Sequence, residues 1–288
     1  MNNVLITGAG GQLGSELREK SLVHPKLNIF GTDHQQLDIT KYSEINDFIK
    51  KNEINSIINC AAFTEVEKAE VEPRKADNIN SLAVENLAMI SKRQGLKLIH
   101  ISTDYVFDGK HYCPYTETDK PNPQSIYGKT KLAGELAIQK INPSNTVIIR
   151  TSWLYSKFGN NFVRKMLDLG DRQDLIKVVD DQIGTPTNAG DLAAAILHIL
   201  PRLHKTEVEI YHFSSEGLAS WFDFAKQIFL LNELPKKLEP VASGAYPSSV
   251  TRPFYSVLNN SKIKKEFGIS IPYWLDSLET MVLASRAK

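Results

Sequence analysis

A tyrosine and a lysine four residues apart are the side chains of this 288-residue chain best suited to acid–base chemistry. On a helix, the spacing of Tyr127 and Lys131 puts both side chains on one face, one turn apart. A phenol has a reference pKa of about 10, and a neighbouring ammonium favours the phenolate. Lys131 is therefore expected to lower the pKa of Tyr127 towards the working pH. Thr103 can hydrogen-bond the same substrate oxygen, so the three residues predict a general acid–base site.

A glycine-rich loop near the N-terminus predicts a nucleotide-binding site. Gly8 allows a tight turn, Gly11 allows the backbone to approach a pyrophosphate, and Gly14 allows a helix to pack on a sheet. The helix that begins at Gln12 and Leu13 would offer free amide groups and a positive dipole end to the phosphates. A glycine-rich turn without a ligand is the alternative interpretation.

Acidic residues after the second expected strand bear on the choice of cofactor. Asp33 can accept hydrogen bonds from the adenosine ribose and would repel a 2′-phosphate, although it can also be a solvated loop acid. No arginine lies between residues 31 and 40 to offset this charge. Asp38, followed by Ile39, either lies beside the adenine or caps the next helix. The sequence favours NADH slightly over NADPH.

Short apolar runs alternate with amphipathic stretches in the first half of the chain. This pattern predicts an α/β fold of the Rossmann type, with a doubly wound parallel sheet covered on both faces. The expected strands are Val4–Ile6, Leu27–Phe30, Ile57–Ile58, Leu98–Ile101 and Val147–Ile149. The expected helices are Gln12–Val23, Tyr42–Glu53, Asn80–Gln94 and Ser125–Ile141.

The pattern changes near Arg150, which predicts two domains: a dinucleotide-binding domain over residues 1–150 and a smaller, mainly substrate-binding domain over residues 151–288. Some later segments are expected to return to the first sheet. The later strands are expected at Ile176–Val179 and Val208–Phe213, and helices at Asn161–Leu169, Asp191–Leu203 and Trp221–Leu231. A Ser-, Gly- and Pro-rich loop over Ser243–Pro253 then precedes two terminal helices.

Composition excludes several classes of protein. The net charge is +1, which gives no indication of a nucleic-acid partner. No apolar run approaches the roughly 20 residues of a membrane helix, and no signal peptide is recognised. Cys60 and Cys113 form neither a metal-binding spacing nor a disulfide framework, so a cytoplasmic protein is expected.

An ordered set of motifs along the whole chain resembles the extended short-chain dehydrogenase/reductase superfamily and, within it, the dTDP-4-dehydrorhamnose reductase family. The motifs are Gly8–Gly14, Cys60–Thr64 with Glu67–Glu70, Ser102–Gly109, Tyr127–Lys131, Arg150–Tyr155, Asp181–Thr187, and Arg252–Pro253 with Ser256 and Leu258.

This resemblance implies that NADPH or NADH reduces the C4 ketone of a dTDP-sugar. Tyr127 would protonate the developing alkoxide, Lys131 would hold the nicotinamide ribose, and Thr103 would orient the carbonyl. The family contacts its cofactor just after the third strand, at positions matched by Ala61, Ala62 and Thr64. Small residues there are equally suited to tight packing of a strand on a helix.

The resemblance also implies substrate contacts for seven residues: Asp104, Tyr105, Val106, Trp153, Asn161, Gln182 and Arg252. Trp153 would pack against the sugar, or else fill the core. Asn161 and Arg252 are candidates for the diphosphate and deoxyribose, because a guanidinium binds phosphate oxygens bidentately. Gln182 belongs to an expected substrate-facing turn.

Two further expectations concern metal and assembly. Some family members are associated with Mg²⁺, and Glu16 matches a candidate position. An exposed acid there more often balances the helix dipole, so no metal site is predicted. A homodimer is expected only by analogy with the family.

Alternatives remain within and outside this chemistry. A nucleotide-sugar dehydratase carries Asp-Glu after the threonine, whereas this chain has Asp104-Tyr105, which argues against dehydration. An epimerase of the same superfamily fits less closely, because the stretch Asp104–Phe107 resembles the reductase more. A related reductase that produces another 6-deoxy sugar stays an open alternative. A non-enzymatic regulatory subunit resembling that of methionine adenosyltransferase is the alternative outside catalysis.

Overall fold

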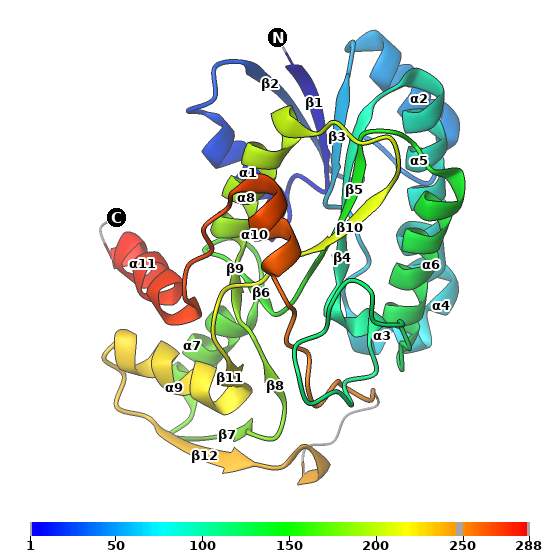
Figure 1. Ribbon diagram of the computed structural model, residues 1–288. Helices are drawn as coiled ribbons and strands as arrows, with labels where there is room; N and C mark the ends of the chain where they lie inside the picture. Colours follow the sequence, from blue (N-terminus) through cyan, green and yellow to red (C-terminus); the bar gives the residue numbers. More distant parts are fainter. Residues whose placement is uncertain (1, 246–249, 287–288) are drawn as a thin grey trace.

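Six parallel strands form the central sheet in a computed structural model that describes residues 2–245 and 250–286 (Figure 1). Their order is β10-β5-β4-β3-β1-β2, so the chain leaves β1 towards one edge and returns on its other side at β3. The strands are β1 Asn2–Thr7, β2 Leu27–Thr32, β3 Ser56–Asn59, β4 Lys97–Thr103, β5 Thr146–Thr151 and β10 Glu209–His212. The predicted α/β class and parallel sheet are confirmed.

Helices cover both faces because successive strand residues point in opposite directions. Val4 and Ile6 pack in a core with α1 and α8, whereas Leu5 packs in a second core under α2, α5 and α6. Figure 1 shows these two helical layers on either side of the sheet. Their bounds are α1 Gln12–Ser21, α2 Tyr42–Lys51, α5 Ala83–Gln94, α6 Ile126–Ile141 and α8 Ala189–Arg202.

The segment between β3 and α5 differs from the prediction. One helix was expected over Asn80–Gln94, but α3 (Val66–Val71), α4 (Pro73–Asp77) and a π-helical turn, η1 (Asn78–Leu82), precede α5. The Asn80 side chain accepts a hydrogen bond from the Phe63 amide at 2.8 Å and donates to its carbonyl at 3.1 Å. This long-range pairing fixes the turn, and no local periodicity reports it.

A smaller group of elements lies beyond the carboxyl ends of the sheet strands (Figure 1). It has an apolar core of its own, which includes Tyr155, Phe224 and Trp274. Its main elements are α7 Phe162–Arg172, β7 Leu175–Val179, α9 Trp221–Leu231, β12 Lys237–Val241 and α11 Trp274–Arg286. Four two-residue strands form two small sheets of their own: β6 Leu154–Tyr155 with β9 Thr187–Asn188, and β8 Ile183–Gly184 with β11 Ala219–Ser220.

The later half of the chain therefore contributes to both groups of elements. β10 completes the parallel sheet beside β5, as expected for a returning segment. α10 (Ser261–Phe267) packs on the sheet core, and α11 packs on the smaller core. The predicted loop Ser243–Pro253 contains the short helix η3 (Ser243–Ala245), and its residues 246–249 lie outside the described residues.

Candidate active site

The glycine-rich loop lies at the point where the strand order reverses. Gly8 has φ +66°, and a Cβ added to it would lie 2.7 Å from the Ala61 backbone nitrogen. A Cβ on Gly14 would lie 2.4 Å from the Gly8 carbonyl oxygen. Both positions therefore exclude side chains. The loop thus packs closely at the carboxyl ends of β1 and β3, which is where dinucleotides bind in sheets of this type.

The small residues after β3 begin beside the glycine-rich loop, because the Ala61 backbone contacts Gly8. Ala61 and Ala62 are partly buried, and Thr64 is exposed. Gln12 and Leu13 open α1 directly after Gly11, whose amide donates to the Gly8 carbonyl at 3.0 Å. The predicted cofactor residues from the first and third strands thus lie together around one helix N-terminus.

The residues after β2 have different surroundings. Asp33 Oδ1 accepts the amides of Gln35 and Gln36 at 2.9 and 3.1 Å, which closes a turn. Asp38 Oδ1 accepts from the Thr40 side chain and amide, and these hydrogen bonds lower the pKa of Asp38. The helix-capping alternative for Asp38 is wrong, because the N-cap of α2 is Lys41. The Ile39 side chain is buried in the apolar core, so only its backbone is available to a ligand.

A cation that the local sequence did not indicate lies beside this turn. A Cβ added to Gly31 would lie 3.1 Å from Arg18 Cδ, so the Arg18 side chain crosses the end of β2 from α1. An arginine thus lies beside the end of β2, although none occurs within residues 31–40. The sequence predicts that Arg18 belongs to the first helix, but it does not show where the side chain lies.

Thr103, Tyr127 and Lys131, which we call the strand-end site, come together at the end of β4 and the start of α6. Thr103 caps the short helix η2 (Asp104–Val106), and its hydroxyl is bonded to the Tyr127 phenol. Tyr127 packs edge-on against Tyr105, with ring centroids 5.5 Å apart. The predicted juxtaposition of a phenol and a hydroxyl is present.

Gly128 makes this approach possible. A Cβ at Gly128 would lie 2.2 Å from the Tyr105 carbonyl oxygen, so α6 begins in direct backbone contact with η2. Two side chains fix the first turn of α6: the Gly128 amide donates to Ser125 Oγ at 3.1 Å, and the Ile126 amide donates to Glu70 Oε1 at 2.7 Å. These helix-start contacts position Tyr127 over the end of β4.

Burial controls the ionisation of Tyr127 and corrects the expected direction. Burial raises the pKa of Tyr127 to about 12, the hydrogen bond with Thr103 acts in the opposite direction, and the Asp104 charge raises it further. The sequence predicted a lowered value from the neighbouring Lys131 ammonium alone, without the effect of burial. The phenol is consequently protonated at neutral pH.

Lys131 is buried, and its ammonium is held by the sheet. Nζ donates to the Ile101 carbonyl at 2.6 Å and lies 3.4 Å from His100 Nε2. Burial lowers the pKa of Lys131 to about 8, while the nearby Glu135 and Cys60 raise it. The lysine is therefore one turn from Tyr127, as predicted, but its first contacts are with β4.

The three residues after Thr103 differ in their access to a ligand. Asp104 is 2% exposed, and burial raises its pKa to about 6 despite hydrogen bonds from Ser256 and Thr103. Val106 is fully buried in a core with Phe107, so a side-chain contact between Val106 and substrate is excluded. Tyr105 is partly exposed, and burial raises its pKa while the nearby Arg252 lowers it. Tyr105 thus connects the strand-end site with Arg252.

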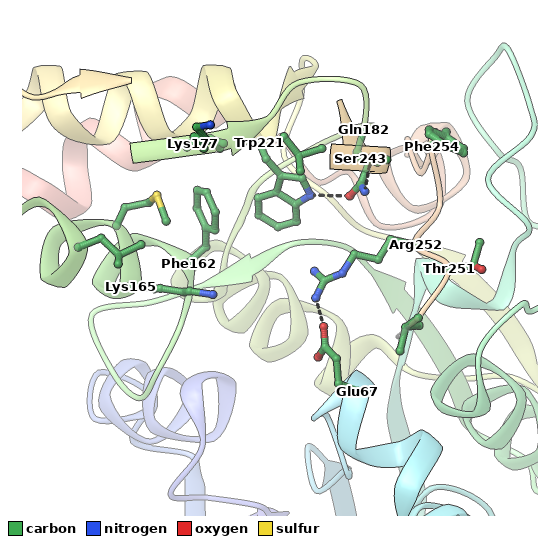
Figure 2. A pocket seen from close by; sticks show the side chains of 16 residues that line it. Glu67, Phe162, Lys165, Lys177, Gln182, Trp221, Ser243, Thr251, Arg252 and Phe254 are labelled. Atoms are coloured by element: carbon green, nitrogen blue, oxygen red, sulfur yellow. Dashed lines mark hydrogen bonds and ion pairs between the residues drawn. The ribbon is translucent and has the colours of Figure 1, made fainter. Parts of the chain in front are cut away.

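A cavity of about 690 Å³ lies beside Arg252, and we call it the α7–α9 pocket (Figure 2). Figure 2 shows the Arg252 guanidinium pointing to the Glu67 carboxylate, with which it forms an ion pair, and Lys165 on the same side of the cavity. Burial raises the pKa of Glu67, but hydrogen bonding and the charges of Arg252 and Lys165 lower it overall. Phe162 and Trp221 supply aromatic walls.

Of the other predicted substrate residues, Gln182 lines the pocket, whereas Trp153 and Asn161 do not. Gln182 accepts from Trp221 Nε1 at 3.2 Å and donates to Ser243 Oγ at 2.8 Å. Trp153 stacks on Trp221 with ring centroids 3.5 Å apart, so it supports the wall from behind. Asn161 caps α7 and donates to the Ser156 carbonyl at 2.7 Å. The Asn161 side chain is thus engaged in local hydrogen bonds, and its contact with the nucleotide stays a prediction.

The family model described as RmlD substrate binding domain matches residues 1–286. The chain belongs to this family. A dTDP-4-dehydrorhamnose reductase of Sinorhizobium fredii is 38% identical, over 97% of this chain and 96% of the relative. A solved dTDP-4-dehydrorhamnose reductase of Clostridium acetobutylicum has a TM-score of 0.93 and 41% identity, covering 99% of both chains. That of Bacillus anthracis, solved in complex with NADP, has a TM-score of 0.93 and 38% identity, covering 99% of this chain and 100% of the other.

Glu16, at the position associated with Mg²⁺ in the family, is buried and hydrogen-bonded within the protein. Glu16 was expected to be exposed, but it is 6% exposed and accepts a hydrogen bond from Ser156 Oγ at 2.6 Å. Its other oxygen lies at the start of α8, 3.3 Å from a Cβ built on Gly190. Within residues 2–245 and 250–286, no group of three or more His, Cys, Asp or Glu side chains is arranged to hold a metal ion.

Several residues of the site were not predicted from the sequence. They are Arg18 at the end of β2, His100 beside Lys131, Gly128 at the start of α6, and Lys165 and Trp221 in the pocket wall. Gly128 belongs to the Tyr127–Lys131 motif, so the sequence contained a signal for it. The roles of the other residues depend on contacts between distant segments.

None of the helices in residues 2–245 and 250–286 has the length and apolar character needed to span a membrane.

Proposed function

We propose that this protein catalyses the NAD(P)H-dependent reduction of the C4 ketone of dTDP-4-dehydro-L-rhamnose to dTDP-L-rhamnose. The observation that carries the proposal is the pairing of a protonated, buried Tyr127 with Thr103 at the same edge of the sheet as the glycine-rich loop. The names of the relatives supply the sugar: proteins at 38% identity over nearly the whole chain are dTDP-4-dehydrorhamnose reductases.

The reaction requires one hydride and one proton. A bound nicotinamide cofactor supplies the hydride to C4, and Tyr127 gives its phenolic proton to the carbonyl oxygen as negative charge develops there. The raised pKa of Tyr127 suits this role, because the acid form is fully present at neutral pH. Thr103 orients the ketone oxygen, and the buried charge of Lys131 stabilises the tyrosinate that remains after transfer.

Cofactor binding is assigned to the carboxyl ends of β1 and β3. Gly8, Gly11 and Gly14 allow the pyrophosphate to approach the backbone, and Asp33 lies where the adenosine ribose binds in such folds. Asp33 opposes a 2′-phosphate, whereas Arg18 attracts it. We infer that both NADPH and NADH are accepted, with Arg18 supporting NADPH.

Substrate binding is assigned to the α7–α9 pocket. Arg252 and Lys165 present two cations on one side, which suits a nucleoside diphosphate. Trp221 and Phe162 present aromatic faces, which suit the thymine base. In this proposal residues 1–150 mainly bind the dinucleotide, and residues 151–288 mainly bind the substrate while also supplying β10 to the sheet.

The deciding experiment is turnover of the purified chain with enzymatically generated dTDP-4-dehydro-L-rhamnose and with other dTDP-4-keto sugars. Oxidation of NADPH or NADH with the rhamnose precursor is expected, and faster turnover of another sugar would reassign the substrate. Dinucleotide binding without turnover of any sugar would favour the regulatory-subunit alternative. A cytoplasmic, homodimeric enzyme is the associated expectation, and light scattering tests its assembly.

A further inference from the structure

A row of buried polar side chains crosses three strands beneath the strand-end site. Thr7 on β1, Asn59 on β3 and His100 on β4 are in-register neighbours in the parallel sheet. The Thr7 hydroxyl donates to Asn59 Oδ1 at 2.6 Å, and the Asn59 amide lies 3.0 Å from His100 Nδ1. His100 Nε2 lies 3.4 Å from Lys131 Nζ, so the row ends at the lysine.

The location of this row is unusual for a parallel sheet. One pleat earlier, the same face carries Leu5, Ile57 and Leu98, which are at most 1% exposed and pack in the apolar core. At the level of Lys131 the three strands carry polar residues instead, and they are equally buried. Burying such groups is unfavourable unless each is hydrogen-bonded. The polar row therefore lies where the buried ammonium of Lys131 needs polar neighbours.

His100 is suited to hold that ammonium. Burial lowers the pKa of His100 well below its ordinary value, and the Lys131 charge lowers it further, so the ring is neutral and does not repel the lysine. With the Ile101 carbonyl, His100 fixes Nζ from the side of the sheet. Asn59 in turn fixes the ring plane of His100. An ammonium can only donate, so Nε2 accepts and the neutral ring carries its proton on Nδ1; this proton is accepted when the Asn59 amide is turned over, with its oxygen towards Nδ1 and its NH2 group towards the Thr7 hydroxyl.

We propose that His100 is a positioning residue of the reductase, and that Asn59 orients it, so that Lys131 points its remaining N–H groups towards Tyr127 and the nicotinamide ribose. This inference rests on the proposed function. Neither residue contacts the reacting atoms; both act through Lys131. The expected signature is weaker dinucleotide binding and slower turnover, without a change in the KM for the sugar.

Two amide substitutions separate positioning from simple packing. In His100→Gln the amide reaches the place of Nε2 beside Lys131, whereas in His100→Asn it reaches only the place of Nδ1 beside Asn59. His100→Asn is expected to lower kcat by about tenfold or more and to raise the cofactor KM several-fold. His100→Gln is expected to stay within about threefold of the parent in both parameters.

The matched control is His212→Gln, because His212 on β10 is also fully buried but is bonded to Arg150 and the Tyr115 carbonyl. It is expected to change thermal stability without changing kcat or the cofactor KM. If His100→Asn does not fold, Asn59→Leu replaces it, with an expected loss in the same parameters. Equal activity of the folded His100→Asn and His100→Gln variants would overturn the proposal.

NADPH fluorescence on binding distinguishes the failure of this inference from the failure of the proposed function. A parent protein that binds NADPH but reduces no dTDP-4-keto sugar contradicts the reductase proposal. The positioning of Lys131 is then judged by binding alone: weaker NADPH binding in His100→Asn, restored in His100→Gln, supports it. Unchanged binding in both variants overturns it.

Discussion

The strand-end site and the α7–α9 pocket are assembled in opposite ways. At the strand-end site, side chains are buried and their pKa values are set by loss of water: burial raises the pKa of Asp104 to about 6 and that of Tyr127 to about 12. In the pocket, Glu67 is exposed enough for Arg252 and Lys165 to lower its pKa overall. The comparison suggests that rigid, dry elements serve the chemistry, and charged, wetter side chains serve recognition.

The two sites also differ in the backbone elements that carry their side chains. Thr103, Tyr127 and Lys131 stand at the end of a strand and in the first turns of a helix, so regular hydrogen bonds fix their Cα positions. The pocket draws its walls from α7, α9, β7 and residues around Ser243 and Arg252 that lie outside regular helices and strands of any length. A change at the strand-end site should therefore affect kcat, and a change in the pocket should affect the KM for the sugar.

The largest expected effect is that of Tyr127→Phe. Removing the phenolic hydroxyl removes the proposed acid and should lower kcat by about 10²–10⁴-fold. The aromatic ring remains, so the contact with Tyr105 and the binding of NADPH should be retained. Steady-state assays measure kcat, and NADPH fluorescence measures cofactor binding. A variant with near-parental kcat and intact cofactor binding would disprove the assignment of Tyr127 as the acid.

Gly128→Ala tests whether backbone contact positions the strand-end site. The added Cβ would meet the Tyr105 carbonyl at 2.2 Å and displace α6 from η2. We expect kcat to fall more than about tenfold and the free energy of unfolding to fall by about 1–3 kcal/mol. Gly95→Ala is the control, because φ +69° strains it while no atom lies within 4 Å of the new Cβ. Loss of stability with unchanged kcat in both variants would contradict the idea.

The buried carboxyl of Asp104 predicts a pH effect on stability. Its pKa of about 6 in the folded chain exceeds the ordinary 3.8, so the folded chain binds this proton more tightly than the unfolded chain. Its contribution to the free energy of unfolding is complete below about pH 4 and is lost as pH rises through about 6.

Asp104→Asn removes this pH dependence. Relative to the parent, the variant should gain of the order of 2 kcal/mol on going from pH 4 to pH 8. Urea unfolding at the two pH values measures the difference. Parallel stability profiles of parent and variant would show that Asp104 ionises normally in the folded protein.

Arg252→Ala sharpens the comparison from the side of the pocket. Loss of one charged contact to a diphosphate should raise the KM for the dTDP-sugar by about tenfold and leave kcat within about twofold. Arg172→Ala at the exposed end of α7 is the matched control, since Arg172 does not line the pocket. A fall in kcat at unchanged KM would place Arg252 with the chemistry instead of with recognition.

The smallest expected effect is that of Arg18→Ala. Removing the cation beside Gly31 should weaken NADPH binding by a few-fold and leave NADH binding unchanged, because only NADPH carries the 2′-phosphate. Fluorescence titration with each cofactor gives the ratio of the two dissociation constants. An equal loss with both cofactors would assign Arg18 to packing.

Much of the sheet and of the strand-end site was predictable because its signals are local. The continuous apolar runs mark strands buried on both faces, and the spacing of Tyr127 and Lys131 on one helix needs no knowledge of other segments. The predictions failed where a distant partner decides the outcome. One helix was expected over Asn80–Gln94, but Asn80 bonds to Phe63 and a π-helical turn precedes α5. The pKa of Tyr127 was expected to fall, but burial raises it.

By itself, the sequence determined the glycine loop, the order of strands and helices, and the identity of the candidate acid, because these depend on residue type and spacing along the chain. Only the tertiary structure decided the direction of the Tyr127 pKa, the burial of Lys131 above His100, and the place of Arg18. These depend on how much water the surrounding elements exclude and on side chains that arrive from other strands and helices. Desolvation and long-range contact are properties of the packed chain, and spacing along the sequence does not record them.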